Sequence, residues 1–183
     1  MLQSGTPRPA SRSSQILAHA DDGPLVQGRE FLWSEADFTR IKALIYKKAG
    51  ISLHEGKHAM VYSRVSRRLR ETGHNSFKTY LDWLEQHDGP EWQEFINALT
   101  TNLTSFFREQ HHFEVLQQML AAKRNHDWRI WCSAASTGEE PYSIAMTAAE
   151  SLGAGGQFQI VNSDIDTKVL ATAARGVYKA DNI

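Results

Sequence analysis

Residues 129–143 read Arg-Ile-Trp-Cys-Ser-Ala-Ala-Ser-Thr-Gly-Glu-Glu-Pro-Tyr-Ser, a short apolar run that leads into a loop with a single glycine. The run predicts a β-strand over 129–134, and a helix is expected from about 140 to 152. A second apolar run at 158–161 predicts another strand, and a helix over 167–175 is expected to follow it. Strand, helix, strand in this order predicts a parallel α/β sheet with a right-handed crossover.

The carboxyl ends of these strands are the expected ligand site, because open α/β sheets bind ligands there. The loop 135–140 follows the first strand, and Asp164 follows the second. An acidic residue at the end of the second strand typically accepts hydrogen bonds from ribose hydroxyls. Asp164 also lies 26 positions beyond Gly138, close to the usual interval of about 20. Asp164 is therefore the predicted ribose-binding residue.

The composition of the loop discriminates between cofactor classes. A dinucleotide site favours Gly-x-Gly-x-x-Gly, whereas this loop has only Gly138, followed by Glu139 and Glu140. Two carboxylates repel phosphate, but they suit S-adenosylmethionine (SAM), which has no phosphate and carries sulfonium and ammonium cations. Each glutamate has an equally good alternative interpretation as a first-turn carboxylate that the helix dipole stabilises.

A segment at 102–109, Asn-Leu-Thr-Ser-Phe-Phe-Arg-Glu, precedes the α/β region and supplies candidate partners for the cofactor. The guanidinium of Arg108 could bind the carboxylate of the cofactor through two hydrogen bonds. Taken alone, a surface arginine paired with Glu109 is the simpler interpretation of Arg108. Asn102 and Thr104 could likewise be ordinary turn-forming residues.

Residues 30–99 predict a separate all-α domain of four helices. Ser34 can cap the first helix, and Asp37, three residues later, can complete a capping box with it. Gly50 can end this helix. The second helix, over about 57–72, repeats apolar residues every four positions, which predicts a buried seam.

Three runs occur together in the order Asn-Leu-Thr-x-Phe-Phe-Arg-Glu, Ser-Thr-Gly-Glu-Glu-Pro-Tyr-Ser and Ser-Asp-Ile-Asp-Thr. With the helical region, they resemble the chemotaxis receptor methyltransferases, the CheR-like family, over residues 31–183. The resemblance implies a separate all-α N-terminal domain followed by a Rossmann-like sheet of a SAM-dependent methyltransferase. It also implies that a methyl group passes from SAM to glutamate side chains of chemoreceptors in chemotaxis signal transduction, with S-adenosylhomocysteine as the product.

The resemblance also implies roles for individual residues. The implied cofactor contacts are Asn102, Thr104, Arg108, Glu139 and Asp164. Arg108 is further implied to lie nearest the methyl-transfer centre, which makes it the predicted catalytic residue. No metal is expected, because His111 and His112 lack carboxylate or cysteine partners at the spacing of metal ligands.

The second helix carries a basic stripe formed by Lys57, Arg64, Arg67 and Arg68. One interpretation is a solvated basic face, which is common. The family resemblance favours a docking surface for the glutamate-bearing cytoplasmic helices of a chemoreceptor, with charge steering the encounter. Nucleic acid is a poorer partner, because the stripe is short and the formal net charge is −1.

The composition indicates a globular protein without membrane insertion. Hydrophobic residues make up 41% of the 183 residues, but no apolar run approaches the roughly 18–20 residues that span a bilayer. Cys132 is the only cysteine, so no internal disulfide can form and a cytoplasmic location is expected. Residues 1–29 lack the apolar core of a signal peptide, and their serine, proline and arginine content predicts a disordered tail.

The α/β region at 100–183 predicts only two strands, whereas the resemblance to SAM-dependent methyltransferases implies a larger sheet of seven, so an incomplete methyltransferase domain is expected. A two-stranded parallel unit has exposed edges and one poorly covered face. We therefore expect a fragment or one half of a partnered protein, whose activity alone is in doubt. Two alternative functions stay open: a SAM-dependent methyltransferase that acts on RNA or another protein, and a non-catalytic receptor-binding module.

Overall fold

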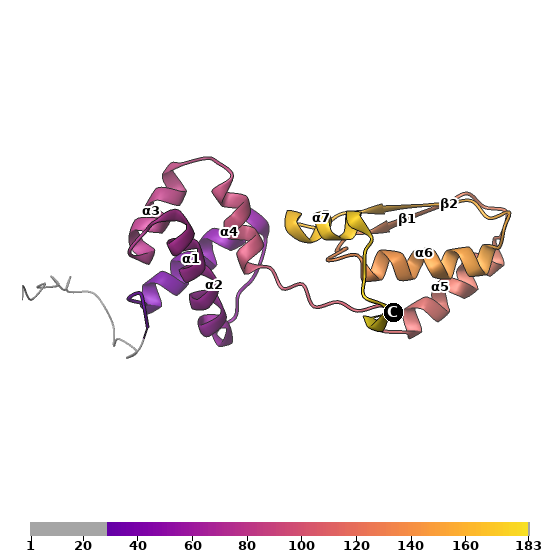
Figure 1. The fold of residues 1–183 in the computed structure, drawn as a ribbon, viewed down its shortest axis with the longest axis horizontal. Helices are drawn as coiled ribbons and strands as arrows, with labels where there is room; N and C mark the ends of the chain where they lie inside the picture. Colours follow the sequence, from indigo (N-terminus) through magenta and orange to yellow (C-terminus); the bar gives the residue numbers. More distant parts are fainter. Residues whose placement is uncertain (1–28, 183) are drawn as a thin grey trace, which may run out of the picture.

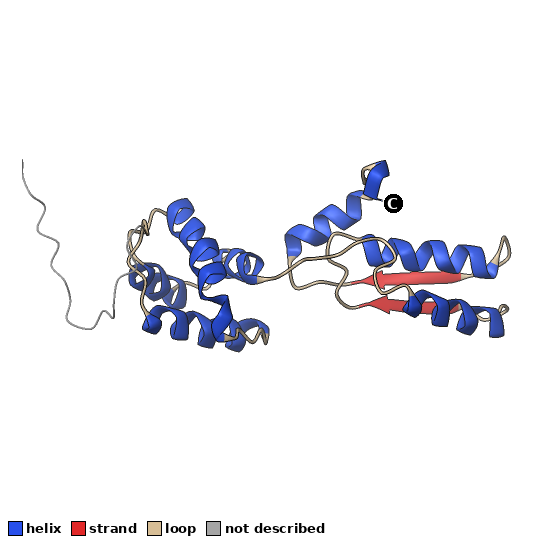
Figure 2. Ribbon diagram, turned by 90° about the horizontal axis from the view of Figure 1, so that it is seen from below, coloured by secondary structure: helices blue, strands red, loops and turns tan. Residues whose placement is uncertain are grey.

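The computed structural model describes residues 29–182, so the tail expected over 1–29 lies outside the described residues except for Arg29. A helical unit and an α/β unit are joined by an extended connecting segment, residues 100–110 (Figure 1). Figure 2 shows the same division, with helices alone on one side of the segment and the sheet with its helices on the other. No helix within residues 29–182 is long and apolar enough to cross a bilayer.

The helical unit consists of α1 (Glu35–Ala49), the short 3-10 helix η1 (Glu55–Lys57), α2 (His58–Thr72), α3 (Phe77–Gln86) and α4 (Glu91–Leu99). Ser34 and Asp37 form the expected capping box: the Asp37 amide donates to Ser34 Oγ over 3.2 Å, and the Ser34 amide donates to Asp37 Oδ2 over 3.0 Å. Gly50 ends α1 with a φ of 68°. The second helix begins one residue later than predicted, because η1 precedes it.

The apolar sides of the four helices meet in one core. Val61, Val65 and Leu69 of α2 are fully buried, as their four-residue repeat predicts, and they pack with residues such as Phe38 and Tyr80. Burial of one large apolar side chain contributes roughly 1.5–3 kcal/mol. This core gives the helical unit its own basis for stability.

Arg68 lies beside this core in a network of ion pairs and hydrogen bonds. Its Nε and Nη2 donate to the two carboxylate oxygens of Glu91 over 2.9 and 2.6 Å, and Tyr80 Oη donates to Glu91 Oε1 over 2.7 Å. The hydrogen bonds with Glu91 raise the pKa of Arg68, while burial and then Glu91 raise the pKa of Tyr80. The Arg68 and Glu91 side chains are only 11% and 13% exposed, so each charge depends on the other for compensation.

We expect Arg68→Met to destabilise the helical unit by about 3–5 kcal/mol, because Glu91 would remain buried without its cation. Arg70→Met is the matched control: Arg70 pairs with Glu30 at 2.7 Å, but both side chains are about half exposed. Such an exposed pair is worth roughly 0–1 kcal/mol. Urea unfolding measures both variants, and equal losses of stability would contradict a structural role for the buried pair.

The α/β unit consists of α5 (His111–Ala122), β1 (Trp128–Cys132), α6 (Glu139–Leu152), β2 (Phe158–Asn162), α7 (Thr167–Arg175) and the 3-10 helix η2 (Ala180–Asn182). The two strands are parallel, as predicted, with Trp128 opposite Phe158 and Cys132 opposite Asn162. The first strand, Trp128–Cys132, starts one residue earlier and ends two residues earlier than the predicted 129–134.

One face of this sheet is covered and the other is open. Helices α5 and α6 lie on the same face (Figure 1), where Leu120, Ala148 and Leu152 are buried. On the opposite face Trp131 and Val161, which are partners in the register, are 69% and 53% exposed. The open face agrees with the expectation of a small, poorly covered parallel unit.

The two units meet where α4 contacts the start of α7. Gln93 Nε2 donates to the carbonyl oxygen of Ile165 over 2.9 Å. Asn97 makes two contacts with Thr167: its Nδ2 donates to Thr167 Oγ1 over 3.2 Å, and its Oδ1 accepts from the Thr167 amide over 3.3 Å. These bonds hold the helical unit against the carboxyl ends of the strands.

Candidate functional site

A pocket of about 570 Å³ lies where the connecting segment passes the carboxyl ends of β1 and β2. Its wall combines three parts of the chain: Leu53, Lys57 and Met60 from the helical unit, Asn102, Thr104 and Arg108 from the segment, and Ser136, Glu140 and Asp164 from the strand ends. Four of the five predicted cofactor residues therefore line one cavity.

Asp164 is held rigidly at the edge of this pocket. Its Oδ2 accepts from the Ser136 amide over 2.8 Å, and its Oδ1 accepts from the Asp166 amide over 2.9 Å. Ser136 has a φ of 47°, a backbone conformation that costs about 1–2 kcal/mol for a residue with a side chain. Each carboxylate oxygen has a further lone pair, so Asp164 keeps acceptor capacity for the hydroxyl groups of a ligand.

Asn102 and Thr104 line the pocket from the connecting segment. The Asn102 side-chain amide donates to Asp166 Oδ2 over 2.7 Å, and the Asn102 carbonyl accepts from Ser136 Oγ over 3.2 Å. These bonds join the segment to both strand ends. Asn102 is therefore more than a turn-forming residue.

Arg108 lies on the same segment, with an exposed side chain that reaches the pocket wall. Its Nη1 donates to the Leu103 carbonyl over 3.1 Å. The residues on either side, Phe107 and Glu109, have φ values of 52° and 58°, each of which costs about 1–2 kcal/mol. Phe107 is anchored, because its amide donates to Ser143 Oγ over 3.0 Å. The backbone thus holds Arg108 in a defined and strained bend.

Glu139 and Glu140 open helix α6, where both benefit from the helix dipole. Glu140 lines the pocket, whereas Glu139 does not; Glu139 Oε2 instead accepts from Thr137 Oγ1 over 2.6 Å. Glu140 also accepts a weak hydrogen bond from the buried Cys132 thiol over 3.4 Å. Burial and then Glu140 raise the pKa of Cys132 to about 11, so this thiol stays protonated near neutral pH.

The four residues of the predicted basic stripe have different environments in the structure. Lys57 lines the pocket, and Arg67 is exposed. Arg64 Nη1 donates to the carbonyls of Ala98, over 3.2 Å, and Thr100. Arg68 is buried in the network with Glu91. Arg64 and Arg68 therefore stabilise the helical unit, which corrects the expectation that all four form one solvent-facing basic surface.

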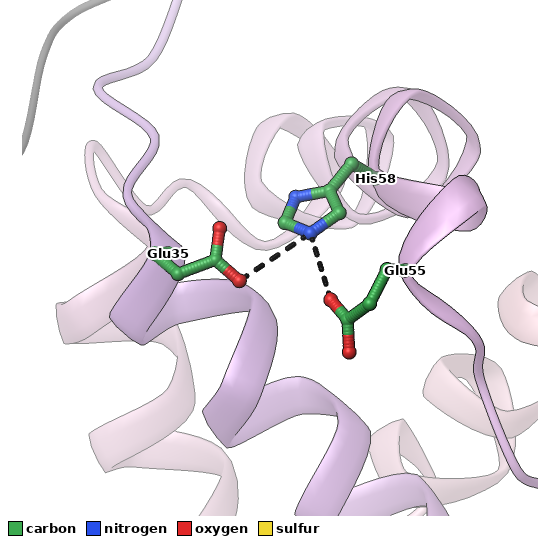
Figure 3. A group of neighbouring side chains, drawn as sticks. All are labelled: Glu35, Glu55 and His58. Carbon is green, nitrogen blue, oxygen red and sulfur yellow. Dashed lines mark hydrogen bonds and ion pairs between the residues drawn. The ribbon is translucent and has the colours of Figure 1, made fainter.

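One group of three side chains within residues 29–182 has the composition of a metal site: Glu35, Glu55 and His58 (Figure 3). His58 Nε2 lies 3.5 Å from Glu35 Oε1 and 3.3 Å from Glu55 Oε2. The amine of Lys42 lies 2.6 Å from the other oxygen of Glu55, and this bond, followed by the one to His58, lowers the pKa of Glu55. Lys42 therefore pairs with the carboxylate of Glu55, and the three side chains lie between the starts of α1 and α2.

The charges around the pocket are of both signs. Lys57 and Arg108 are cationic, while Glu109, Glu140 and Asp164 are anionic. A zwitterionic nucleoside such as SAM needs a cation for its carboxylate, anions for its ammonium and sulfonium, and an acceptor for its ribose hydroxyls. The residues present fit these requirements, and none of them forms a phosphate-binding glycine-rich loop.

Two family profiles match this chain, and together they span most of it. The profile described as "CheR methyltransferase, all-alpha domain" matches residues 36–100. The profile described as "CheR methyltransferase, SAM binding domain" matches residues 102–183. The matches confirm the predicted fold class and identify SAM as the cofactor.

The chain is also similar to curated proteins. It is 54% identical over 153 residues to the chemotaxis protein methyltransferase of Escherichia coli (strain K12), covering 82% of this chain and 53% of the relative. It is 48% identical over 163 residues to chemotaxis protein methyltransferase 2 of Pseudomonas aeruginosa, covering 87% of this chain and 58% of the relative. The chain thus spans about half the length of the curated relatives it matches.

Proposed function

Because this chain belongs to the CheR methyltransferase family, we propose that it serves in the transfer of a methyl group to glutamate side chains of chemoreceptors. The observation that carries the proposal is the pocket at the strand ends, where Asn102, Arg108 and Asp164 line one cavity. The proposal concerns a protein as long as its relatives, because they are about twice as long as the part that matches.

The proposed reaction does not require the protein to act as a general acid or base. SAM supplies a methyl group on a positively charged sulfur, and a glutamate carboxylate takes it to give a methyl ester and S-adenosylhomocysteine. A free glutamate has a pKa of about 4.3, so it is already an anion at neutral pH and needs no general base. The task of the pocket is therefore alignment of the reactants and exclusion of water.

In this proposal, each residue of the pocket has a binding role. Arg108 binds the cofactor carboxylate and lies nearest the transferred methyl group, and Asp164 accepts from the ribose hydroxyls. Asn102 and Thr104 contact the amino-acid part of the cofactor from the connecting segment. Glu139 is proposed as a further contact from the family resemblance; its neighbour Glu140 already lines the pocket.

The substrate is proposed to approach over the helical unit. Of the four residues in the predicted basic stripe, Lys57 on the pocket wall and the exposed Arg67 are the two that remain available to glutamate-bearing helices. Complementary charge would speed and orient the encounter. The proposed partner is the cytoplasmic part of a methyl-accepting chemoreceptor, which places the reaction in the cytoplasm.

Methyl transfer from labelled SAM to a receptor cytoplasmic fragment tests the function, using a form of the protein as long as its relatives. We expect label in the receptor that mild alkali releases as methanol, because esters hydrolyse under conditions that leave N-methyl groups intact. Alkali-stable label, or label in RNA instead of the receptor, would favour another methyltransferase substrate. Receptor binding without SAM binding would favour a non-catalytic module.

A further inference from the structure

Asp166 is a buried carboxylate that none of the assigned pocket roles uses. It is 3% exposed and follows Asp164 at the end of β2. Its two oxygens have different partners. Oδ1 accepts from the amides of Lys168 over 2.9 Å and Val169 over 3.4 Å, which caps helix α7. Oδ2 accepts from Thr100 Oγ1 over 2.8 Å and Asn102 Nδ2 over 2.7 Å.

The contact with Asn102 determines which way its amide group faces. An ionised carboxylate can only accept hydrogen bonds, so the NH₂ end of Asn102 must be the end that faces Asp166. No hydrogen bond among residues 29–182 uses the other end, Asn102 Oδ1, although Asn102 lines the pocket. The side-chain oxygen is therefore available as an acceptor for a ligand.

We propose that Asp166 is a positioning residue that orients Asn102 so that Oδ1 accepts a hydrogen bond from the ammonium group of the cofactor. The proposal rests on the proposed function, because it assumes that the cofactor occupies the pocket at the strand ends. It gives a reason for a charged group in this position: a carboxylate selects one orientation of the neighbouring amide, whereas a neutral amide could pair with either orientation. Asp166 thereby links the recognition of the amino-acid part of the cofactor to the connecting segment and to the cap of α7.

Asp166→Asn is the informative variant, because it changes one atom type and retains the size. The oxygen of the new amide can stay at Oδ1 and keep capping α7, which places its NH₂ group where Oδ2 was. Two NH₂ groups would then face each other, so Asn102 turns and presents its own NH₂ to the cofactor ammonium. The variant thus converts an attraction at the ammonium site into a repulsion and leaves the ribose site in place.

Two ligands separate this effect from a general loss of structure. S-adenosylhomocysteine carries the amino-acid group, whereas 5′-methylthioadenosine has the same thioether nucleoside without it. For Asp166→Asn in this 183-residue chain, we expect affinity for S-adenosylhomocysteine to fall about tenfold or more, as for a lost charged hydrogen bond. Affinity for 5′-methylthioadenosine should stay within about twofold of the wild-type value.

Asn97→Ala is the matched control, because it breaks the contacts of α4 with Thr167 without touching Asp166 or Asn102. It should leave the ratio of the two affinities unchanged. Equal losses for both ligands in Asp166→Asn would show a merely structural role and would overturn the proposal. If the folded wild-type chain binds neither ligand, the result contradicts the claim that this pocket binds the cofactor. That outcome is distinct from one that contradicts only the role of Asp166.

Discussion

Replacing Arg108 by alanine is expected to remove most methyl transfer from a form of the protein as long as its relatives. Arg108 is the exposed cation on the connecting segment that reaches the pocket. An arginine–carboxylate contact is charge-assisted and can be bidentate. Removing a group that stabilises charge at a reacting centre typically costs about 10²–10³-fold in rate. We therefore expect kcat/KM to fall by at least about 100-fold.

The balance between kcat and KM separates two roles of Arg108. A rise in KM for SAM with little change in kcat would mean that the guanidinium only anchors the cofactor carboxylate. A fall in kcat as well would mean that it also aligns the methyl group. Arg175→Ala is the control, because this exposed arginine at the end of α7 does not line the pocket. Near-normal values of both kcat and KM for SAM in Arg108→Ala would remove Arg108 from the mechanism.

Replacing Gly138 by alanine is expected to abolish binding of S-adenosylhomocysteine by disrupting the α/β unit. Gly138 has a φ of 105°, which side-chain-bearing residues rarely adopt. A Cβ at this position would lie 2.2 Å from Tyr178 Oη and 3.0 Å from Ala173 Cα in helix α7. The tyrosine could move only by giving up its 2.7 Å hydrogen bond to the Thr137 carbonyl. Backbone strain and overpacking together should cost about 2–5 kcal/mol.

Gly73→Ala is the control that separates the effect of the steric clash from the free energy needed to hold a side-chain-bearing residue at a positive φ. Gly73 ends α2 with a φ of 75°, but a Cβ there meets nothing within 4 Å. This variant should lose only about 1–2 kcal/mol and should retain ligand binding. Calorimetry with S-adenosylhomocysteine, together with urea unfolding, compares the two variants. Normal binding by Gly138→Ala would mean that the loop between β1 and α6 tolerates a side chain and does not determine the pocket.

Local signals in the sequence were enough to predict the elements and the edge at which the site lies. The capping box of Ser34 and Asp37 involves residues three positions apart, and it starts α1 where expected. Asp164 lies at the end of β2, as predicted, because the alternation of strand and helix alone defines which strand ends meet. These features depend on neighbours in the chain.

Features that depend on distant contacts could not be predicted in the same way. The local sequence assigns Arg68 to a basic surface, but in the structure Arg68 is buried and bonded to Glu91, which lies 23 residues further along the chain. Asp166 meets Thr100 across 66 positions, and nothing in its local sequence indicates that bond. Which of the two adjacent glutamates lines the pocket is likewise a property of the fold: Glu140 reaches the pocket, whereas Glu139 accepts from Thr137 Oγ1.

The most direct test of the cofactor site is calorimetric binding of S-adenosylhomocysteine to this 183-residue chain, with Asp164→Asn measured beside it. Asp164 is held by the amides of Ser136 and Asp166 at the pocket edge, and the variant replaces one acceptor oxygen by a donor. We expect micromolar binding by the wild-type chain and a loss of about tenfold or more in the variant. Equal binding by both would contradict the role of Asp164. No binding by a chain that still unfolds cooperatively would contradict the claim that these residues suffice to bind the cofactor.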